Sequence, residues 1–360
     1  MKVLQIAPLW ETVPPPAYGG TEAVVSVLTE ELVRAGHEVT LCASGDSRTR
    51  AELLSVFPHS LRTARDLQDP WPYAWLHSVL ALKEAGEFDI IHNHAGELTM
   101  AMAHLVPDVP MLSTMHCLVT PDTKFIWDRY AGYYNTISMS QRRNMPPLAN
   151  GHFVGVVYNA IDVRSFPYDE RKEDYLLFLS RISVDKMPHL AVEVARRTGR
   201  RLIIAGKVDR VDEHYFNTVL APLIDGKQVQ FMGEADARLK RELYRKAHGL
   251  VLPLCWEEPF GLVMIEAMAC GTPVVSFGRG SVPEVVVDGE TGYIVNDLDE
   301  MVDAVRRLDR ISPRRCRRHV EDNFDAPVMA NRYLQAYQRI IVRERAHARF
   351  LPAADSAGVA

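Results

Sequence analysis

Two glutamates, Glu258 and Glu266, stand in a segment whose pattern reads strand, loop, helix and stop. Pro259 suits the first position of a helix, and Gly271 is typical of the position just after a helix end. The pattern therefore predicts Glu258 at the helix entrance and Glu266 about two turns inside the helix. Carboxylates at these two depths can accept hydrogen bonds from the hydroxyl groups of a bound ligand.

The start of this predicted helix is also a candidate anion site. The first N–H groups of a helix have no acceptor within it and lie at the positive end of its dipole. Here they belong to about Phe260, Gly261 and Leu262, and Gly261 leaves room for a ligand near the backbone. These features favour a diphosphate. Another interpretation stays open, in which Glu258 only caps the helix and Glu266 lies on a solvated face.

Two cations, Arg181 and Lys186, follow an apolar run at residues 175–179. Cations just beyond the carboxyl end of a strand can neutralise a diphosphate. Gly19 and Gly20 stand between the first strand-like run and the first helical pattern, where small residues let a ligand approach the backbone. A glycine pair alone is weak evidence, because most such pairs are only turns.

The elements that must position these residues alternate between strand-like and helix-like segments, which predicts parallel sheets with crossover helices. A first series of expected strands covers residues 3–7, 38–43, 90–92, 111–114 and 136–138. A second series covers residues 175–179, 201–205, 229–231, 249–253 and 273–276. The polar segment 162–174 between them reads as a linker. Two α/β domains in tandem leave one natural ligand site, the cleft at the carboxyl ends of both sets of strands.

Composition excludes several classes of protein. The chain has 360 residues, enough for two domains, and a net charge of −5 with a pI near 6.2, so it lacks the basic field that draws proteins onto nucleic acid. Five scattered cysteines without a C-x-x-C pair predict reduced thiols and a cytoplasmic location. The first apolar run reads as a strand and not as a signal peptide. Because no run approaches the roughly 20 apolar residues of a membrane span, we expect a soluble protein with at most peripheral membrane contact.

The segment from Glu258 to Pro273 resembles the signature of retaining glycosyltransferase family 4, with Pro-Phe-Gly after the first glutamate and Glu-Ala-Met-Ala-Cys-Gly-Thr-Pro from the second. Residues 19–20, 113–116, 158–162, 178–187 and 276–293 are similar to further family segments. The resemblance implies that Arg181 and Lys186 hold the donor diphosphate and that His116 faces the donor sugar. Three positions depart from the family, since Ala160, Ser180 and Met187 stand where glycine is usual.

The resemblance implies a GT-B fold, in which two Rossmann-like domains face each other across a cleft. Residues 1–165 would bind the acceptor, and residues 166–320 would bind the nucleotide sugar. Residues 321–346 would form a helix that packs back on the N-terminal domain, followed by a tail at 347–360. Its implied activity is retaining transfer of a hexose from UDP-glucose, or from GDP-mannose as second choice, to an unidentified hydroxyl acceptor. No cofactor and no metal are expected.

The expected site residues fall into two sets. The catalytic set is Arg181, Lys186, Glu258 and His116, and the donor-binding set is Gly19, Gly20, Phe260, Gly261, Leu262 and Glu266. In the donor-binding set, Glu266 is expected to hold the ribose.

Alternatives remain at this point. A sugar-nucleotide epimerase of the same architecture and a non-catalytic nucleotide-sugar-binding protein are the nearest ones. A nicotinamide dehydrogenase is disfavoured because no G-x-G-x-x-G follows the first strand. His92 and His94 could be metal ligands or could line the cleft, although no third ligand motif stands near them. Residues 314–318 could meet anionic lipid or form a solvated helix surface.

Overall fold

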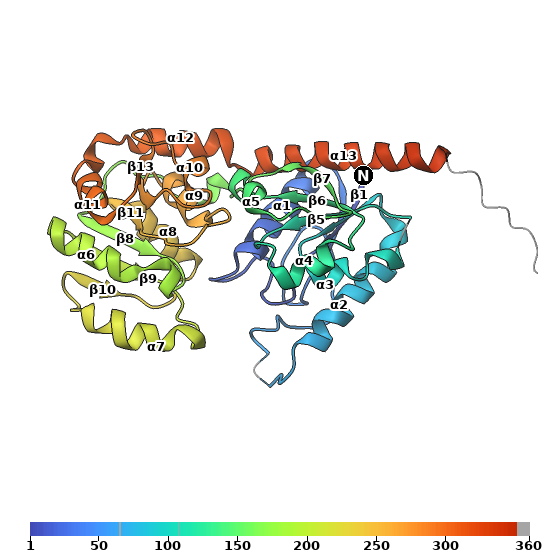
Figure 1. The fold of residues 1–360 in the computed structure, drawn as a ribbon, viewed down its shortest axis with the longest axis horizontal. Helices are drawn as coiled ribbons and strands as arrows, with labels where there is room; N and C mark the ends of the chain where they lie inside the picture. Colours follow the sequence, from blue (N-terminus) through green and yellow to red (C-terminus); the bar gives the residue numbers. More distant parts are fainter. Residues whose placement is uncertain (65, 107, 351–360) are drawn as a thin grey trace, which may run out of the picture.

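The computed structural model describes residues 1–64, 66–106 and 108–350. These residues form two domains, each a parallel sheet covered by helices on both faces (Figure 1). The strand order of the N-terminal sheet is β3 (Glu52–Leu54), β2 (Glu38–Cys42), β1 (Lys2–Ile6), β4 (Ile90–Asn93), β5 (Met111–Met115), β6 (Tyr133–Thr136) and β7 (His152–Val156). That of the C-terminal sheet is β10 (Val229–Phe231), β9 (Arg201–Ala205), β8 (Tyr175–Leu179), β11 (Gly249–Leu252), β12 (Val274–Phe277) and β13 (Gly292–Val295). The prediction of two parallel-sheet domains is confirmed.

The helices of the N-terminal domain are α1 (Gly20–Arg34), α2 (Trp71–Lys83), α3 (Glu97–Met100), α4 (Pro121–Trp127) and α5 (Met139–Asn144). Those that follow are α6 (Pro188–Thr198), α7 (Glu213–Tyr215), α8 (Ala237–Lys246), α9 (Leu262–Ala269), α10 (Val282–Val285), α11 (Leu298–Arg306), α12 (Pro313–Asn323) and α13 (Ala326–Phe350). In each sheet the strand order reverses next to the first strand, between β1 and β4 and between β8 and β11. Parallel sheets bind ligands beyond the carboxyl ends of strands at such a reversal.

Most central strands lie where the sequence predicted them, and the strands at residues 175–179, 201–205 and 229–231 agree in both bounds. The strand expected at 136–138 is wrong. Ser138 instead caps α5, where its Oγ accepts a hydrogen bond from the Gln141 N–H. The edge strands β3, β7 and β13 were missed. Two of these strands contain a glycine, which is uncommon in strands and weakens the sequence pattern. Gly155 of β7 takes a positive φ of 135° where the register is irregular, and Gly292 is the first residue of β13.

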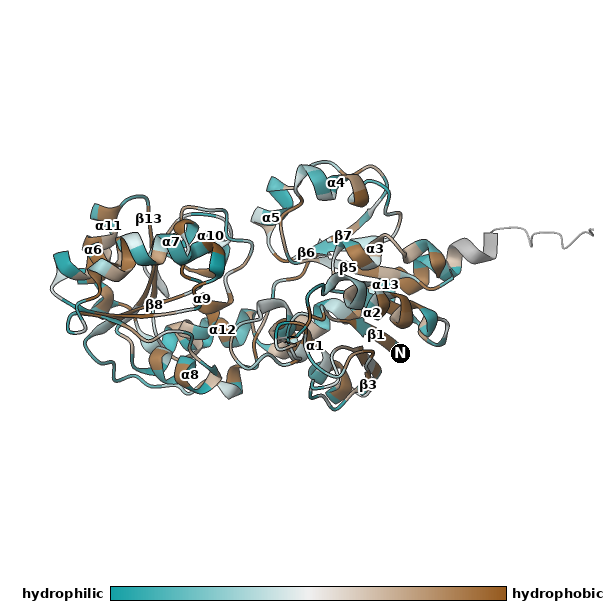
Figure 2. Ribbon diagram, turned by 90° about the horizontal axis from the view of Figure 1, so that it is seen from below, coloured by the Kyte–Doolittle hydropathy of each residue, from teal (hydrophilic) through white to brown (hydrophobic). Residues whose placement is uncertain are grey.

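Both faces of β8 are buried, which explains its uninterrupted apolar sequence. Leu177 and Leu179 face a core shared with α8, α9 and α12, whereas Leu176 and Phe178 face a second core shared with α6 and α11. Figure 2 shows β8 as a brown strand between the helices of the C-terminal domain. Alternation along the strand thus places one sheet between two apolar layers.

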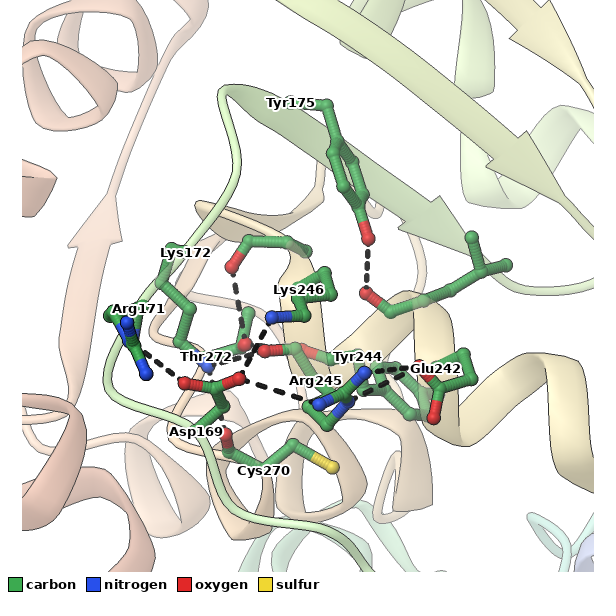
Figure 3. Close-up of polar contacts among 12 residues, drawn as sticks. Asp169, Arg171, Lys172, Tyr175, Glu242, Tyr244, Arg245, Lys246, Cys270 and Thr272 are labelled. Carbon is green, nitrogen blue, oxygen red and sulfur yellow. Dashed lines mark hydrogen bonds and ion pairs between the residues drawn. The ribbon is translucent and has the colours of Figure 1, made fainter.

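The segment between β7 and β8 is attached to the C-terminal domain by polar contacts (Figure 3). The Lys172 ammonium donates to the carbonyl oxygens of Arg245, at 2.9 Å, and Cys270, at 2.8 Å. These carbonyls lie at the ends of α8 and α9, where the helix dipoles favour a cation. The Asp169 carboxylate accepts a hydrogen bond of 2.9 Å from Lys246. The entry into β8 is therefore tied to the two helices that flank it.

The basic segment at residues 314–318 lies in α12, which begins at Pro313. Arg317 points inward and donates to the carbonyl oxygens of Phe166 and Ala269, both at 2.8 Å. Arg315 and Arg318 form ion pairs with Glu290 and Asp322.

None of the helices in residues 1–64, 66–106 and 108–350 is both long and apolar enough to cross a lipid bilayer.

Helix α13 leaves the C-terminal domain and runs back over the N-terminal one (Figure 1). Its Tyr333, Tyr337 and Ile340 belong to the buried core that contains Leu28 of α1 and Val3 of β1. All five side chains are at most 1% exposed. Helix α13 thus completes the core of the first domain.

One prediction concerns His77 of α2, which is 1% exposed and donates through Nε2 to the Ala7 carbonyl at 2.9 Å. Burial lowers its pKa from 6.5 to about 4. Between these two values, His77 is protonated in the unfolded chain but not in the folded protein. The free energy of unfolding therefore falls as the pH decreases from 6.5 to 4. Urea titrations at pH 7 and pH 4 should show about 3 kcal/mol more loss in wild type than in His77→Gln. Equal losses would contradict the shifted pKa.

Candidate functional site

A cavity of about 170 Å³ lies between the two domains, beside the carboxyl end of β8 and the starts of α1 and α9. Five of the residues that the sequence singled out line it, namely Gly19, Gly20, Arg181, Leu262 and Glu266. The two helix starts meet at this cavity, because a Cβ on Gly20 would lie in contact with Leu262 Cδ1, at 3.6 Å. Residues from both domains therefore meet at the place where parallel sheets bind ligands.

Lys186 and Glu258 form an ion pair in which Lys186 Nζ donates to Glu258 Oε2. The same oxygen accepts a hydrogen bond of 3.1 Å from the Trp256 indole N–H, and Nζ lies 4.3 Å from the centre of the Trp256 ring. Both charged side chains are nearly buried, at 9% and 14% exposure. Each of the two charges is therefore compensated by the other. Lys186 Nζ has three hydrogens and can donate to a second acceptor without releasing Glu258.

Arg181 is held more loosely than Lys186. Its guanidinium lies 3.4 Å from the Asp185 carboxylate and 3.8 Å from that of Asp212, and a third of the side chain is exposed. The two acidic partners position the cation, while the long distances leave most of its five N–H donors free for an anion.

The start of α9 differs from the prediction. The helix begins at Leu262 with Gly261 as its N-cap, not at Pro259, so Glu258 lies before the helix and not at its entrance. Gly261 has a φ of 77°, a left-handed conformation, so the α-helix cannot extend toward the N-terminus beyond Leu262. A Cβ there would also lie 2.7 Å from Met264 Cε.

The N–H groups of Gly261, Leu262 and Val263 have no acceptor among the described residues. Gly261 provides no side-chain cap either, and no described side chain caps the helix in its place. The interpretation of Glu258 as a simple helix cap is therefore wrong. Free N–H groups at the positive end of α9 are what an anion requires.

Glu266 is buried inside the first turns of α9, with 6% exposure, so its placement on a solvated face is also wrong. Its Oε1 accepts from Lys240 Nζ at 2.9 Å, and its Oε2 accepts from the Tyr244 hydroxyl at 2.8 Å. Each carboxylate oxygen keeps a lone pair for a further donor, such as a hydroxyl group of a ligand in the cavity.

Phe260 and His116 lie apart from the cavity. The Phe260 side chain is 2% exposed and packs against Tyr158 and Phe324, so only its backbone is near α9. His116 follows β5 in the N-terminal domain, where its Nε2 lies 2.9 Å from His94 Nδ1. The residues expected to bind a diphosphate, Arg181, Lys186 and the start of α9, thus lie in the C-terminal domain, whereas His116 lies in the N-terminal domain.

His92 and His94 are both buried, and neither lines the cleft. Both nitrogens of each ring are hydrogen-bonded, those of His92 to Tyr337 and Thr114 and those of His94 to His116 and Gln5. In residues 1–64, 66–106 and 108–350, no group of three or more His, Cys, Asp or Glu side chains has an arrangement that could hold a metal ion.

Several residues of the site were missed from the sequence. Lys207 and Lys240 also line the cavity and add positive charge to it. Gly280 takes a φ of 58° and lies so close to Glu258 that a Cβ would be 2.3 Å from its backbone N and O. Its N–H donates to the Glu257 carboxylate at 2.8 Å. The glycine-rich run from Ser276 signalled such a close approach, but not what it approaches.

Glu284 of α10 joins the two domains beside the site. Its carboxylate accepts hydrogen bonds from the N–H groups of Met139, at 2.7 Å, and Ser140, at 2.5 Å, and from the Tyr158 hydroxyl at 2.9 Å. Met139 and Ser140 begin α5 of the N-terminal domain, so a carboxylate of one domain caps a helix of the other. This contact fixes how the facing edges of the two sheets lie.

Comparison with known proteins finds glycosyltransferases that match nearly the whole chain. Residues 18–165 match the family described as Glycosyltransferase Family 4, and residues 163–320 match the one described as Glycosyl transferases group 1. A glycogen synthase of Mycobacterium tuberculosis is 27% identical, with 94% of each chain covered. The crystal structure of a glycosyltransferase involved in avilamycin A biosynthesis is 27% identical and superposes with a TM-score of 0.76, covering 95% of this chain and 98% of that one.

HepE of Anabaena, solved in complex with UDP-glucose, shares the fold at 15% identity, with a TM-score of 0.71 and coverage of 94% and 100%. Together with the two facing parallel sheets and the site between them, these matches establish that the chain belongs to glycosyltransferase family 4 and is a glycosyltransferase of the GT-B fold.

Proposed function

We propose that the protein is a retaining hexosyltransferase whose donor, a nucleoside diphosphate sugar, binds in the C-terminal domain. The observation that carries the proposal is the grouping of two cations with the start of α9. Arg181 lines the cavity beside that helix, and Lys186 pairs with Glu258, which lies against Gly261 at the free N–H groups. Two cations and a helix start can together hold a diphosphate and the charge that grows on it as the bond to the sugar breaks.

The ion pair between Lys186 and Glu258 links the diphosphate to the sugar in this proposal. Lys186 donates to a phosphate oxygen, while Glu258 accepts from hydroxyl groups of the hexose beside it. The acceptor hydroxyl, brought by the N-terminal domain, then attacks from the face that the diphosphate leaves. The proton of that hydroxyl passes to the departing diphosphate, so the products are a glycoside and a nucleoside diphosphate.

The remaining donor contacts follow from the cavity. Glu266 lies within α9, whereas Glu258 precedes that helix, and Glu266 is proposed to hold the ribose diol, since its oxygens keep free lone pairs. Gly19 and Gly20 let the N-terminal backbone approach the phosphates. His116, from the facing edge of the other sheet, is proposed to contact the transferred sugar.

UDP-glucose is the first donor to test, because a protein of the same fold binds it. GDP-mannose is the second. The proposed compartment is the cytoplasm, in keeping with five unpaired cysteines, of which Cys117 and Cys255 are exposed.

The test is a panel of nucleotide sugars with and without candidate hydroxyl acceptors. We expect release of nucleoside diphosphate from UDP-glucose to be stimulated by an acceptor, with the α-anomeric configuration of the donor kept in the product by NMR. Activity should survive a chelator, because side chains and helix N–H groups take the place of a metal. Inversion in the product, or conversion of the donor to another nucleotide sugar without acceptor, would contradict the proposal.

A further inference from the structure

Buried polar side chains line the face of the N-terminal sheet that α13 covers. Alternation along the strands first places apolar residues on this face, such as Val3 of β1 and Ile90 of β4. Two positions further toward the carboxyl ends stand Gln5 and His92, which are both fully buried. Polar groups are placed in such a core only with hydrogen-bond partners, because an unpaired one costs free energy.

These partners form an unbroken hydrogen-bond chain that begins at Asn135 of β6. The Asn135 amide nitrogen donates to the Thr136 carbonyl at 3.3 Å, so its Oδ1 faces Thr114, whose hydroxyl donates to it at 2.7 Å. The single hydroxyl hydrogen of Thr114 is thereby used. Consequently His92 Nε2, 2.6 Å from Thr114 Oγ1, must carry the hydrogen of that bond.

The chain continues through Tyr337 of α13. Burial lowers the pKa of His92 well below 6.5, so the ring is neutral and carries only one nitrogen-bound hydrogen. Because that hydrogen is on Nε2, Nδ1 has a lone pair and can only accept. The Tyr337 hydroxyl, 2.6 Å away, therefore donates to His92 Nδ1. The same hydroxyl accepts from Gln5 Nε2 at 3.2 Å, which turns Gln5 Oε1 toward His94.

The last two bonds continue the same donor-to-acceptor direction as far as His116, which follows the carboxyl end of β5. His94 Nε2 donates to Gln5 Oε1 at 2.8 Å, and His94 is neutral because burial lowers its pKa. Its Nδ1 is then an acceptor, so His116 Nε2 donates to it at 2.9 Å. His116 is neutral as well, since burial lowers its pKa to about 4. Its Nδ1 has no hydrogen-bond partner in the described part of the chain.

We propose that Tyr337 is a positioning residue which, through this hydrogen-bond chain, fixes His116 in the tautomer with hydrogen on Nε2 and a lone pair on Nδ1. His116 then accepts a hydrogen bond from a hydroxyl group of the bound sugar and cannot donate one. The proposal rests on the proposed function, which places His116 at the transferred sugar. It assigns a role in the reaction to α13, none of whose described residues lines the donor cavity.

The direct test is the tautomer of His116. In protein labelled with ¹⁵N-histidine, long-range ¹H–¹⁵N correlation spectra distinguish a protonated from an unprotonated ring nitrogen, and loss of the signals in His116→Gln assigns them. Wild type should show hydrogen on Nε2 alone. Tyr337→Phe removes the hydroxyl that orients Gln5, so His116 should show a mixture of both tautomers.

Tyr333→Phe is the matched control, because Tyr333 lies on the same helix and is equally buried. Its hydroxyl bonds Thr114 and Asn135 from the side, and its removal leaves each link of the chain in place. The control should keep the wild-type tautomer. Should Tyr337→Phe fail to fold, Gln5→Met breaks the chain at the next link with the same expectation.

Kinetics complete the test. Tyr337→Phe should lower kcat in proportion to the fraction of His116 that takes the other tautomer, about twofold for an equal mixture, and leave the affinity for free nucleoside diphosphate unchanged. Tyr333→Phe should keep both values. A wild-type Nε2 without hydrogen, or an unchanged tautomer in Tyr337→Phe, overturns the proposal, as does a changed tautomer with unchanged kcat. Failure of the proposed function would look different, since wild type would then turn over no nucleotide sugar whatever its tautomer.

Discussion

Replacing Lys186 with alanine is expected to lower kcat by a factor of roughly a hundred to a thousand, the usual effect of removing one group that stabilises charge in the transition state. Lys186 is the cation closest to Glu258, and its ammonium keeps free hydrogens for a phosphate oxygen. Arg181→Ala should act in the same direction. The measurement is acceptor-dependent release of nucleoside diphosphate at saturating donor.

A matched control is Lys246→Ala. Lys246 also pairs with a carboxylate, that of Asp169 at 2.9 Å, but it lies at the far end of α8 and does not line the cavity. This variant should keep kcat within about a factor of two of wild type, because a partly exposed ion pair contributes little to stability. Since Lys186→Ala leaves Glu258 without its cation, thermal unfolding must be compared alongside. A folded Lys186→Ala protein with nearly normal kcat would contradict the role of Lys186 at the diphosphate.

The two glutamates are expected to fail in different ways when each is changed to glutamine. Glu258→Gln should lower kcat about a hundredfold, because its carboxylate is proposed to contact the sugar, where charge and shape change most during the reaction. The affinity for free nucleoside diphosphate should stay close to wild type, since that ligand lacks the sugar. Calorimetric titration of the diphosphate, beside steady-state kinetics, measures both quantities.

Glu266→Gln should weaken the donor and the free diphosphate by similar factors and lower kcat less. This is the signature of lost uniform binding, because the ribose does not change during the reaction. Glutamine also keeps an acceptor for Tyr244 but loses the charge that pairs with Lys240, so both variants must be shown to fold. The reverse pattern, with diphosphate affinity lost in Glu258→Gln and kept in Glu266→Gln, would mean that the two roles are exchanged.

A feature of this site can be predicted from the sequence when neighbouring residues along the chain determine it. Arg181 could be placed just beyond β8, and the segment that carries Glu258 and Glu266 could be placed after β11, because both strands are uninterrupted apolar runs. The start of α9 could not, since Gly261 takes a left-handed conformation that a following run of helix-forming residues does not reveal. Pro259 pointed to an earlier start and proved misleading.

Long-range contacts explain the other differences. The pairing of Lys186 with Glu258 joins residues 72 positions apart, and the bond between His92 and Tyr337 joins residues 245 apart. No pattern along the chain marks such pairs. The polar residues at the ends of buried strands, Gln5, His92 and Thr114, were nevertheless a readable signal, because buried polar groups require partners. Those partners could have been sought in the aromatic residues of α13.

The path of α13 has a consequence for how the protein is made. Nascent chains usually fold domain by domain, with the N-terminal domain first. Here the apolar core of the N-terminal domain contains Tyr333, Tyr337 and Ile340, which the ribosome adds after all the strands of both sheets. The C-terminal domain is continuous in sequence from β8 to α12 and has its own core. The domain synthesised second can therefore complete its fold before the domain synthesised first.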